Sequence, residues 1–235
     1  MTILVTGAGK GLGAEICRHL ATNGHDVAIH YRFSKEEAIL VAEECRQQDV
    51  SVDTIQGDFD TPASLDSFIA HYLDRFPDTK GLVNNVGNYL LASSTAATTD
   101  QWFALFQTNF FASVFLTNAL LPSLKAHRGS VVNLGVTGLQ MSRAFTKATV
   151  YAATKSALLF YTVSLAKELA KDFVRVNMVS PGYLENGTDL KNPSELPFNR
   201  PAYLHEVAHV VASFFDPQNV YITGQNIEVA GGIGL

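Results

Sequence analysis

The chain has 235 residues, of which 47% are apolar and only 17% are charged, and its formal net charge is −5. Because an ordinary globular domain carries about 25% charged residues, this composition predicts a large buried core and excludes a mainly disordered chain. The negative balance also excludes the basic surface with which proteins neutralise nucleic-acid phosphates, so we expect neither nucleic acid nor an anionic membrane as a partner.

Two cysteines and a short apolar run at the N-terminus bear on the compartment. Cys17 and Cys45 are the only cysteines, and both fall in predicted helices, which is not the pattern of a disulfide framework. The run from Ile3 to Val5 is too short for a secretory signal. We therefore expect a reducing, cytoplasmic setting.

Short β-branched runs alternate with longer helical patterns along the chain, which is typical of β–α–β units with a parallel sheet. The expected strands are 3–6, 27–30, 50–56, 82–84, 130–134, 174–179 and 226–229. The expected helices are 12–23, 35–48, 62–75, 100–127, 150–171 and 203–215. The sequence thus predicts one α/β domain over residues 1–235, with a three-layer, doubly wound parallel sheet of seven strands.

The predicted helix 100–127 lies in a stretch with very little charge. From Gly81 to Leu124 the only charged residue is Asp100. A membrane span needs roughly 20 mainly apolar residues, but polar side chains and Pro122 interrupt this stretch. We expect a helix that is buried on most of its faces, one of them against a second subunit.

Residues 182–202 interrupt the alternation of strands and helices. This stretch contains Pro193, Pro197 and Pro201 and follows the sixth predicted strand. Because ligands bind beyond the carboxyl ends of strands in open parallel sheets, the stretch is a candidate substrate lid. A surface insertion without such a role is the alternative.

A glycine-rich turn joins the first strand to the first helix. It reads Gly7-Ala8-Gly9-Lys10-Gly11-Leu12-Gly13. Glycines let the backbone approach a diphosphate, whose charge is met by the N–H groups at the start of the helix. Since the turn follows the first strand of a β–α–β series, it predicts a dinucleotide site rather than a bare tight turn.

The end of the second strand indicates which dinucleotide binds. An acidic residue there would accept hydrogen bonds from the ribose 2′-hydroxyl of NAD, whereas an arginine favours a 2′-phosphate. This chain has Tyr31 and Arg32 there and no acid. Lys10 adds a second cation in the glycine turn, so NADP(H) is the expected cofactor, unless both cations are ordinary solvated charges.

Tyr151 and Lys155 lie four residues apart in a predicted helix, so both project from one face. A nearby ammonium favours the phenolate and is expected to lower the tyrosine pKa towards the working pH. The pair is therefore a plausible proton donor to a carbonyl oxygen. Without other motifs, the same spacing would indicate only an amphipathic helix with a surface lysine.

Taken together, the motifs resemble the short-chain dehydrogenase/reductase family over essentially the whole chain. Besides the glycine turn they are Asn84-Asn85-Val86-Gly87, Tyr151-Ala152-Ala153-Thr154-Lys155 and Pro181-Gly182. Their order and spacing match the TGxxxGxG, NNAG, YxxxK and PG motifs of that family. The resemblance implies a Rossmann-type sheet of strand order 3-2-1-4-5-6-7 and a homodimer or homotetramer.

The resemblance also implies roles for individual residues. Tyr151 protonates the substrate while NADPH delivers hydride, Lys155 also holds the nicotinamide ribose, and Asn109 supports a proton relay through water. Further residues implied around the cofactor are Asp58, which accepts from the adenine amine, Phe59, Asn84, Asn85, Val86, Gly87, Pro181, Gly182, Tyr183 and Leu184.

One family residue is missing. The family places a serine after the fifth strand to orient the substrate oxygen, but counting from Asn133 puts Val136 there, and counting back from Tyr151 puts Gly138 there. Neither side chain can donate a hydrogen bond. Thr137 is the nearby hydroxyl that could replace the serine, and Ser142 is a more distant candidate.

The missing donor puts the substrate in doubt more than the fold. Pteridine reductases within the family carry Asp at this position, and the stretches His30-Tyr31-Arg32-Phe33-Ser34 and Pro181-Gly182-Tyr183-Leu184-Glu185 resemble theirs. A small carbonyl, enoyl or pterin-like substrate is therefore expected. A dinucleotide-binding protein with impaired catalysis is the alternative.

A motif from a different class of enzyme also occurs. His205-Glu206-Val207-Ala208-His209 matches the HExxH pattern, which on a helix presents two imidazoles to zinc and a glutamate as general base. Glu228 follows at a spacing that some zinc peptidases use for a third ligand, but it lies in a predicted strand. We expect surface histidines on a helix that the reductase family has anyway, and no metal; a zinc peptidase is the remote alternative.

Overall fold

Seven parallel strands form one sheet in the order β3-β2-β1-β4-β5-β6-β7 in the computed structural model, which describes residues 1–140, 144–189 and 191–233. The order is the one that the motifs imply, and the predicted fold class is confirmed. The strands are β1 (Thr2–Val5), β2 (Asp26–Tyr31), β3 (Val52–Gln56), β4 (Thr79–Asn84), β5 (Ser130–Leu134), β6 (Arg175–Pro181) and β7 (Asn226–Val229).

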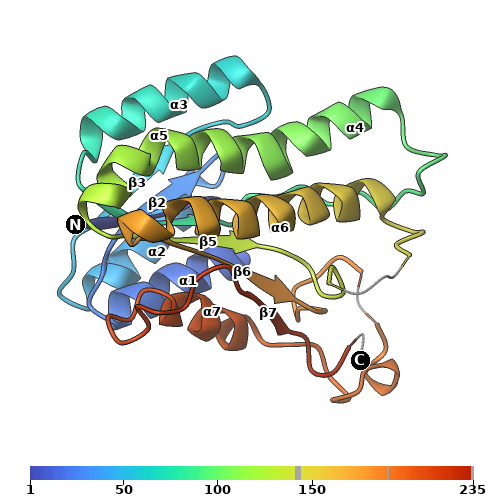
Figure 1. Cartoon of the computed structure of the whole chain (residues 1–235). Helices are drawn as coiled ribbons and strands as arrows, with labels where there is room; N and C mark the ends of the chain where they lie inside the picture. The colour runs from blue at the N-terminus through green and yellow to red at the C-terminus, as the bar shows by residue number, and fades with distance from the viewer. Residues whose placement is uncertain (141–143, 190, 234–235) are drawn as a thin grey trace.

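Helices cover both faces of the sheet (Figure 1). One face carries α1 (Gly11–Thr22), α2 (Lys35–Arg46) and α7 (Leu204–Ser213); the other carries α3 (Pro62–Arg75), α4 (Thr99–Phe106), α5 (Ala112–Ala126) and α6 (Thr149–Leu169). Short 3-10 turns span Ala170–Asp172 and Pro193–Glu195. Because side chains alternate along a strand, Ile3 and Val5 lie in the core on the α1 face, while Leu4 lies in the core under α3 and α5.

Local signals set the boundaries of α3. Thr61 is the N-cap, its Oγ1 accepts from the Ser64 N–H at 3.1 Å, and the Ser64 hydroxyl in turn bonds the Thr61 N–H. This reciprocal capping box satisfies two helix-end donors, and Pro62 occupies the first helical turn, where no donor is needed. The predicted range 62–75 is therefore the observed one.

The predicted continuous helix 100–127 is interrupted. A π-helical turn, Gln107–Phe111, separates α4 from α5. Within this turn the Thr108 hydroxyl donates to the Ala104 carbonyl, four residues earlier, at 3.0 Å. Single π turns of this kind occur often at functional sites.

One face of this helix is exposed in the single chain, which is the face that the sequence predicts to lie against a second subunit. Phe103 is 71% exposed, and Phe111 and Phe115 are also exposed. On the neighbouring helix α6, Phe160 is 76% exposed and Val163 lies on the surface as well. Residues Thr99–Ala126 are long and apolar enough to cross a membrane, but less than half of the most apolar window is buried and core helices of soluble proteins meet the same criterion.

Candidate active site

The glycine turn lies where the sheet order reverses, between β1 and β4. Gly7 and Gly11 have φ angles of +62° and +60°, which side chains rarely adopt. A Cβ on Gly13 would lie 2.5 Å from the Gly7 carbonyl oxygen and 2.7 Å from Asn85 Nδ2. Helix α1 therefore starts so close to the strand end that glycine is required, and the turn is open to a ligand at the switch point.

Hydrogen bonds join the glycine turn to the end of β4. Asn85 Nδ2 donates to the carbonyls of Thr6 (2.8 Å) and Gly7 (3.0 Å). The N–H groups of Asn85 and Val86 donate to Thr6 Oγ1 at 2.9 and 3.1 Å. The two loops form one unit, so Asn85 and Val86 lie beside the turn as the motifs imply.

Asn84 does not line the site, contrary to what the resemblance implies. Its Nδ2 donates to Asn133 Oδ1 at 2.8 Å and to Thr117 Oγ1 at 3.2 Å, and Asn133 Nδ2 continues to Thr162 Oγ1 at 2.8 Å. All four residues are buried. The strand alternation turns Asn84 towards α5 and α6, where it joins a closed polar network.

His30, at the end of β2, connects three segments of the site, a role that the sequence analysis missed. Its Nδ1 accepts from the Gly7 N–H at 2.9 Å and its Nε2 lies 3.3 Å from the Gly57 carbonyl. The ring stacks on Phe59 with centroids 4.4 Å apart. Burial lowers the His30 pKa to about 4, so the ring is neutral, with its proton on Nε2. Only the side-chain hydrogen bonds, not the sequence pattern, reveal this role.

A cavity of about 340 Å³ extends from the glycine turn along the ends of β2 and β4. Its lining includes most residues predicted for the adenosine half of a dinucleotide, namely Gly7, Lys10, Tyr31, Arg32, Phe59, Asn85, Val86 and Gly87, together with His30, Phe33, Ser34, Gly57, Asp60, Asn88 and Thr108. The remaining glycines of the motif, Gly9, Gly11 and Gly13, and Leu12 belong to the adjoining turn and first helical turn. The residues present therefore fit a nucleotide.

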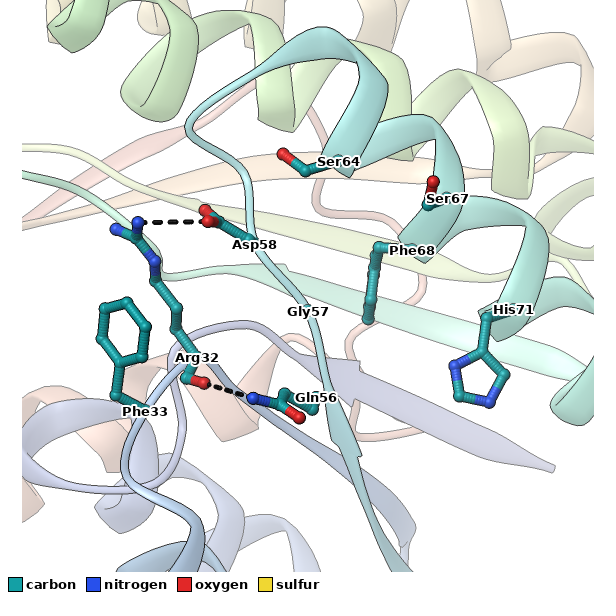
Figure 2. Close-up of a pocket in the computed structure, with 9 residues that line it drawn as sticks. All are labelled: Arg32, Phe33, Gln56, Gly57, Asp58, Ser64, Ser67, Phe68 and His71. Atoms are coloured by element: carbon teal, nitrogen blue, oxygen red, sulfur yellow. Dashed lines mark hydrogen bonds and ion pairs between the residues drawn. The ribbon is translucent and has the colours of Figure 1, made fainter.

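A second cavity, of about 480 Å³, adjoins the first and shares Arg32, Phe33 and Gly57 with it. Figure 2 shows Arg32 and Phe33 on one side, Ser64, Ser67 and His71 of α3 on the other, and Gly57 between them.

Arg32 is paired with two carboxylates. Its Nη2 lies 3.1 Å from Asp58 Oδ2 and 2.5 Å from Asp60 Oδ2, and its guanidinium lies 4.4 Å from the centroid of the Phe33 ring. The Asp58 contact is visible in Figure 2. Asp58, implied as the acceptor of the adenine amine, thus contacts Arg32 in this structure, and Asp60 is a residue of the site that the motifs do not indicate.

The Tyr151 and Lys155 side chains meet on α6, as the spacing predicts. Lys155 Nζ donates to the Leu134 carbonyl at 2.7 Å and lies 5.7 Å from the centroid of the Tyr151 ring. A Cβ on Gly87 would lie 3.3 Å from this Nζ, so the missing side chain leaves room for the lysine. Burial lowers the pKa of Lys155 to about 8.

The predicted lowering of the Tyr151 pKa is not found. Burial raises the Tyr151 pKa to about 12, and the neighbouring Tyr89 phenol acts in the same direction. The rings of Tyr89 and Tyr151 meet edge to face with centroids 5.0 Å apart. Burial is the largest cause of this shift, and Lys155 directs its Nζ at the Leu134 carbonyl. Tyr89 is a site residue that the motifs did not identify.

Asn109 lies in the π turn, and both polar atoms of its side chain form hydrogen bonds within the protein. Its Nδ2 donates to the Asn88 carbonyl at 2.9 Å and to Thr154 Oγ1 at 3.2 Å, and its Oδ1 accepts from the Asn88 N–H at 2.7 Å. Both amide hydrogens are therefore used. The side chain fixes the loop after β4 against α6, and its support of a proton relay through water remains a prediction.

The Thr137 hydroxyl, predicted as a substitute for the missing serine, binds a carboxylate in this structure. Its Oγ1 donates to Glu228 Oε2 at 2.6 Å, and the Gly138 N–H donates to Glu228 Oε1 at 2.8 Å. Glu228, on β7, thus holds the loop after β5 through a carboxylate. This pair carries no signal in the sequence, because the two residues are 91 positions apart. Ser142 lies outside the described residues.

The insertion after β6 starts beside the glycine turn. Gly182 donates to the Val229 carbonyl at 3.0 Å, and Leu184 pairs with Ala202, which closes the base of the insertion. A Cβ on Gly11 would lie 3.0 Å from Asn186 Nδ2, so the first residues of the insertion pass over the turn. Pro181 ends β6 next to them, and the predicted lid remains a prediction.

The HExxH residues do not form a metal site. Glu206 binds the Arg200 guanidinium with both oxygens, at 2.6 and 2.8 Å, and caps α7 by accepting from the Tyr203 N–H. His205 stacks on Tyr203 with centroids 5.5 Å apart. Within residues 1–140, 144–189 and 191–233, no three histidine, cysteine or acidic side chains are grouped to hold a metal.

A glycine turn at a switch point, next to a buried Tyr–Lys pair, is the arrangement of an oxidoreductase that binds a nicotinamide dinucleotide. The family model described as short chain dehydrogenase matches residues 1–196. The chain belongs to the short-chain dehydrogenase family.

Individual relatives cover nearly the whole chain. The chain is 31% identical over 245 residues to the 3-oxoacyl-[acyl-carrier-protein] reductase FabG of Staphylococcus aureus, covering 98% of this chain and 96% of the relative. Among solved structures, acetoin dehydrogenase from Enterobacter cloacae superposes with a TM-score of 0.90 at 27% identity, over 98% of this chain and 94% of the other. A blue fluorescent protein from a metagenomic library, in complex with NADPH, superposes with a TM-score of 0.91 at 28% identity, over 100% of this chain and 98% of the other.

Proposed function

We propose that the protein is an NADPH-dependent reductase of a small carbonyl, enoyl or pterin-like substrate, with Tyr151 as proton donor. One observation carries the proposal: the buried Lys155 ammonium lies under the Tyr151 ring and beside Gly87, at the edge of the nucleotide cavity. A buried cation without a carboxylate partner would be costly unless it had a function in catalysis or binding.

The residues assigned to the cofactor are those around the glycine turn and the cavity. The N–H groups at the start of α1 would hold the diphosphate, Lys10 and Arg32 the 2′-phosphate, and Lys155 the nicotinamide ribose. Pro181, Gly182 and Leu184 are assigned to the nicotinamide end, because β6 ends there beside the insertion. When bound, the dihydronicotinamide supplies a hydride to the substrate carbon.

Tyr151 has the right protonation state for a reductase. With a pKa near 12 it carries its proton at neutral pH, and it can donate that proton to an oxygen on which negative charge develops. The product gains one hydride on carbon and one proton on oxygen. The phenolate left on Tyr151 is stabilised by the Lys155 ammonium, whose own pKa of about 8 keeps it largely charged at neutral pH.

The test combines a substrate screen with one variant. NADPH oxidation is measured with dihydropterins, quinones, 3-oxoacyl thioesters and α-diketones. Tyr151→Phe should lower turnover at least about 10²-fold and leave NADPH binding intact, since only the donated proton is removed. Tyr161→Phe, on the same helix, is the matched control and should retain turnover. Unchanged turnover in Tyr151→Phe contradicts the proposal.

A second candidate function is nucleotide binding without efficient turnover. The observation that favours it is the bond between Thr137 and Glu228, which engages the nearby hydroxyl, while Val136 or Gly138 stands at the position of the family's substrate-orienting serine. Removing one positioned donor typically lowers turnover by about 10²- to 10³-fold. NADPH binding with no oxidation in any arm of the screen would favour this candidate.

We also propose that the protein is cytoplasmic and forms a homodimer or homotetramer. The subunits would contact one another through the exposed aromatic face of α4, α5 and α6. This face contains Phe103, Phe111, Phe115, Phe160 and Val163. Several exposed large apolar side chains on helices that pack together are typical of an interface.

A further inference from the structure

The Asp60 carboxylate lines the nucleotide cavity and contacts Arg32, one of the cations assigned to the 2′-phosphate. Asp60 Oδ2 is 2.5 Å from Arg32 Nη2, closer than Asp58 Oδ2 at 3.1 Å. Asp58 is held differently, because its Oδ1 accepts the Asp60 N–H at 2.9 Å, and it lines the outer cavity instead. Of the two carboxylates, Asp60 is thus the one that lines the cavity proposed for the nucleotide.

The charges around Arg32 do not favour a phosphate. One guanidinium faces two carboxylates, which leaves this cluster with a net charge of −1. Lys10 is the other cation along the cavity and brings the sum to zero. A phosphate monoester carries a charge of about −1.5 to −2 at neutral pH, so it gains little from this cluster as a whole.

Arg32 nevertheless retains capacity for an anion. Its Nε is buried and has no hydrogen-bond partner among the described residues. The guanidinium has five N–H donors, and both carboxylates contact the same nitrogen, Nη2. A buried donor without a partner costs free energy, and an added acceptor would recover it. The site therefore combines a usable donor group with a competing carboxylate.

We propose that Asp60 is a specificity-determining residue that competes with the 2′-phosphate for Arg32 and thereby reduces the preference of the site for NADPH over NADH. The proposal rests on the dinucleotide site proposed above. Asp60 lowers the affinity for the phosphorylated cofactor because its charge both neutralises Arg32 and repels the phosphate. NADH, whose 2′-hydroxyl is neutral, is affected little.

The experiment measures binding, so it needs no substrate. Dissociation constants of NADPH, NADH, 2′,5′-ADP and 5′-AMP are determined by calorimetry for the wild-type protein and for Asp60→Asn, which keeps the shape and removes the charge. The two fragments differ only by the 2′-phosphate. We expect Asp60→Asn to bind NADPH and 2′,5′-ADP about tenfold more tightly, and NADH and 5′-AMP within about twofold of wild type.

Asp53→Asn is the matched control. Asp53 also pairs with an arginine, Arg75, at 2.9 Å, but lines neither cavity. The Asp53→Asn variant loses the same charge as Asp60→Asn, and it should leave all four dissociation constants unchanged. The tenfold gain should shrink at about 0.5 M salt, where screening shortens the reach of charges.

Two results overturn the proposal while the dinucleotide site stands: unchanged or weaker NADPH binding by Asp60→Asn, or a gain that Asp53→Asn reproduces. If the wild-type protein binds neither dinucleotide, the proposed function fails, and this inference fails with it.

Discussion

Replacing His30 by phenylalanine tests whether this ring holds the glycine turn together. Phenylalanine preserves the ring and its stacking on Phe59, but it removes the acceptor of the Gly7 N–H and the donor to the Gly57 carbonyl. A buried donor left without a partner costs about 1–3 kcal/mol, and a lost bond to a carbonyl about 1 kcal/mol. His30→Phe should therefore lower the free energy of unfolding by about 2–4 kcal/mol at pH 7.5.

The pH dependence separates this mechanism from simple repacking. His30 has a pKa of about 4 in the folded protein, against about 6.5 in an unfolded chain. Below pH 6.5 the unfolded state binds a proton that the folded state does not, so wild-type stability is lost as the pH falls from 6.5 towards 4. At pH 5.0, which is about 1.5 pH units below the pKa of the unfolded chain, the wild-type protein has lost about 2 kcal/mol of its free energy of unfolding. The variant has no histidine at this position and does not share this loss.

The assay is urea unfolding of both proteins at pH 7.5 and 5.0. His25, whose pKa is also lowered to about 4, titrates in both proteins, so the difference between them isolates His30. The stability gap should narrow by about 2 kcal/mol at the lower pH. A gap of equal size at both pH values would refute the buried neutral histidine.

Three further predictions concern other parts of the molecule. Gly13→Ala should destabilise the protein by about 1–3 kcal/mol and weaken NADPH binding, because the added Cβ lies 2.5 Å from the Gly7 oxygen; thermal unfolding and calorimetry measure both. Thr137→Val should cost about 1–2 kcal/mol in urea unfolding by removing the bond to Glu228, yet leave NADPH oxidation within about twofold; a 10²-fold loss would instead assign Thr137 to the substrate. Phe160→Asp should reduce the mass measured by light scattering without changing stability by more than about 0.5 kcal/mol; an unchanged mass would place the interface elsewhere.

The sequence predicts the fold well because strands and helices in this chain follow local rules. Alternation of apolar runs and a capping signal at Thr61 are enough to locate α3 to the residue. The glycine turn is predictable for the same reason, because strand, glycines and helix are contiguous. The π turn at Gln107–Phe111 is not, since the pattern of apolar residues in a helix gives no signal for a single wider turn.

The site is less predictable where partners are distant in sequence. Thr137 looks like a spare hydroxyl until β7 brings Glu228 next to it. Asn84 belongs to the same motif as Asn85, but strand alternation turns it into the interior. The Tyr151 pKa could not be obtained from the Tyr–Lys spacing, because the burial that dominates it comes from the surrounding fold.

The π turn also sets the phase between the two parts of the long helix. An α-helix rotates by about 100° per residue, so one extra residue in a turn offsets all following side chains by that angle. Helix α4 packs on α6, whereas α5 packs on β4 and α3. Each part can therefore orient its own apolar side towards its own neighbour. The change in orientation falls at the π turn, where Asn109 bonds to Asn88 in the loop after β4.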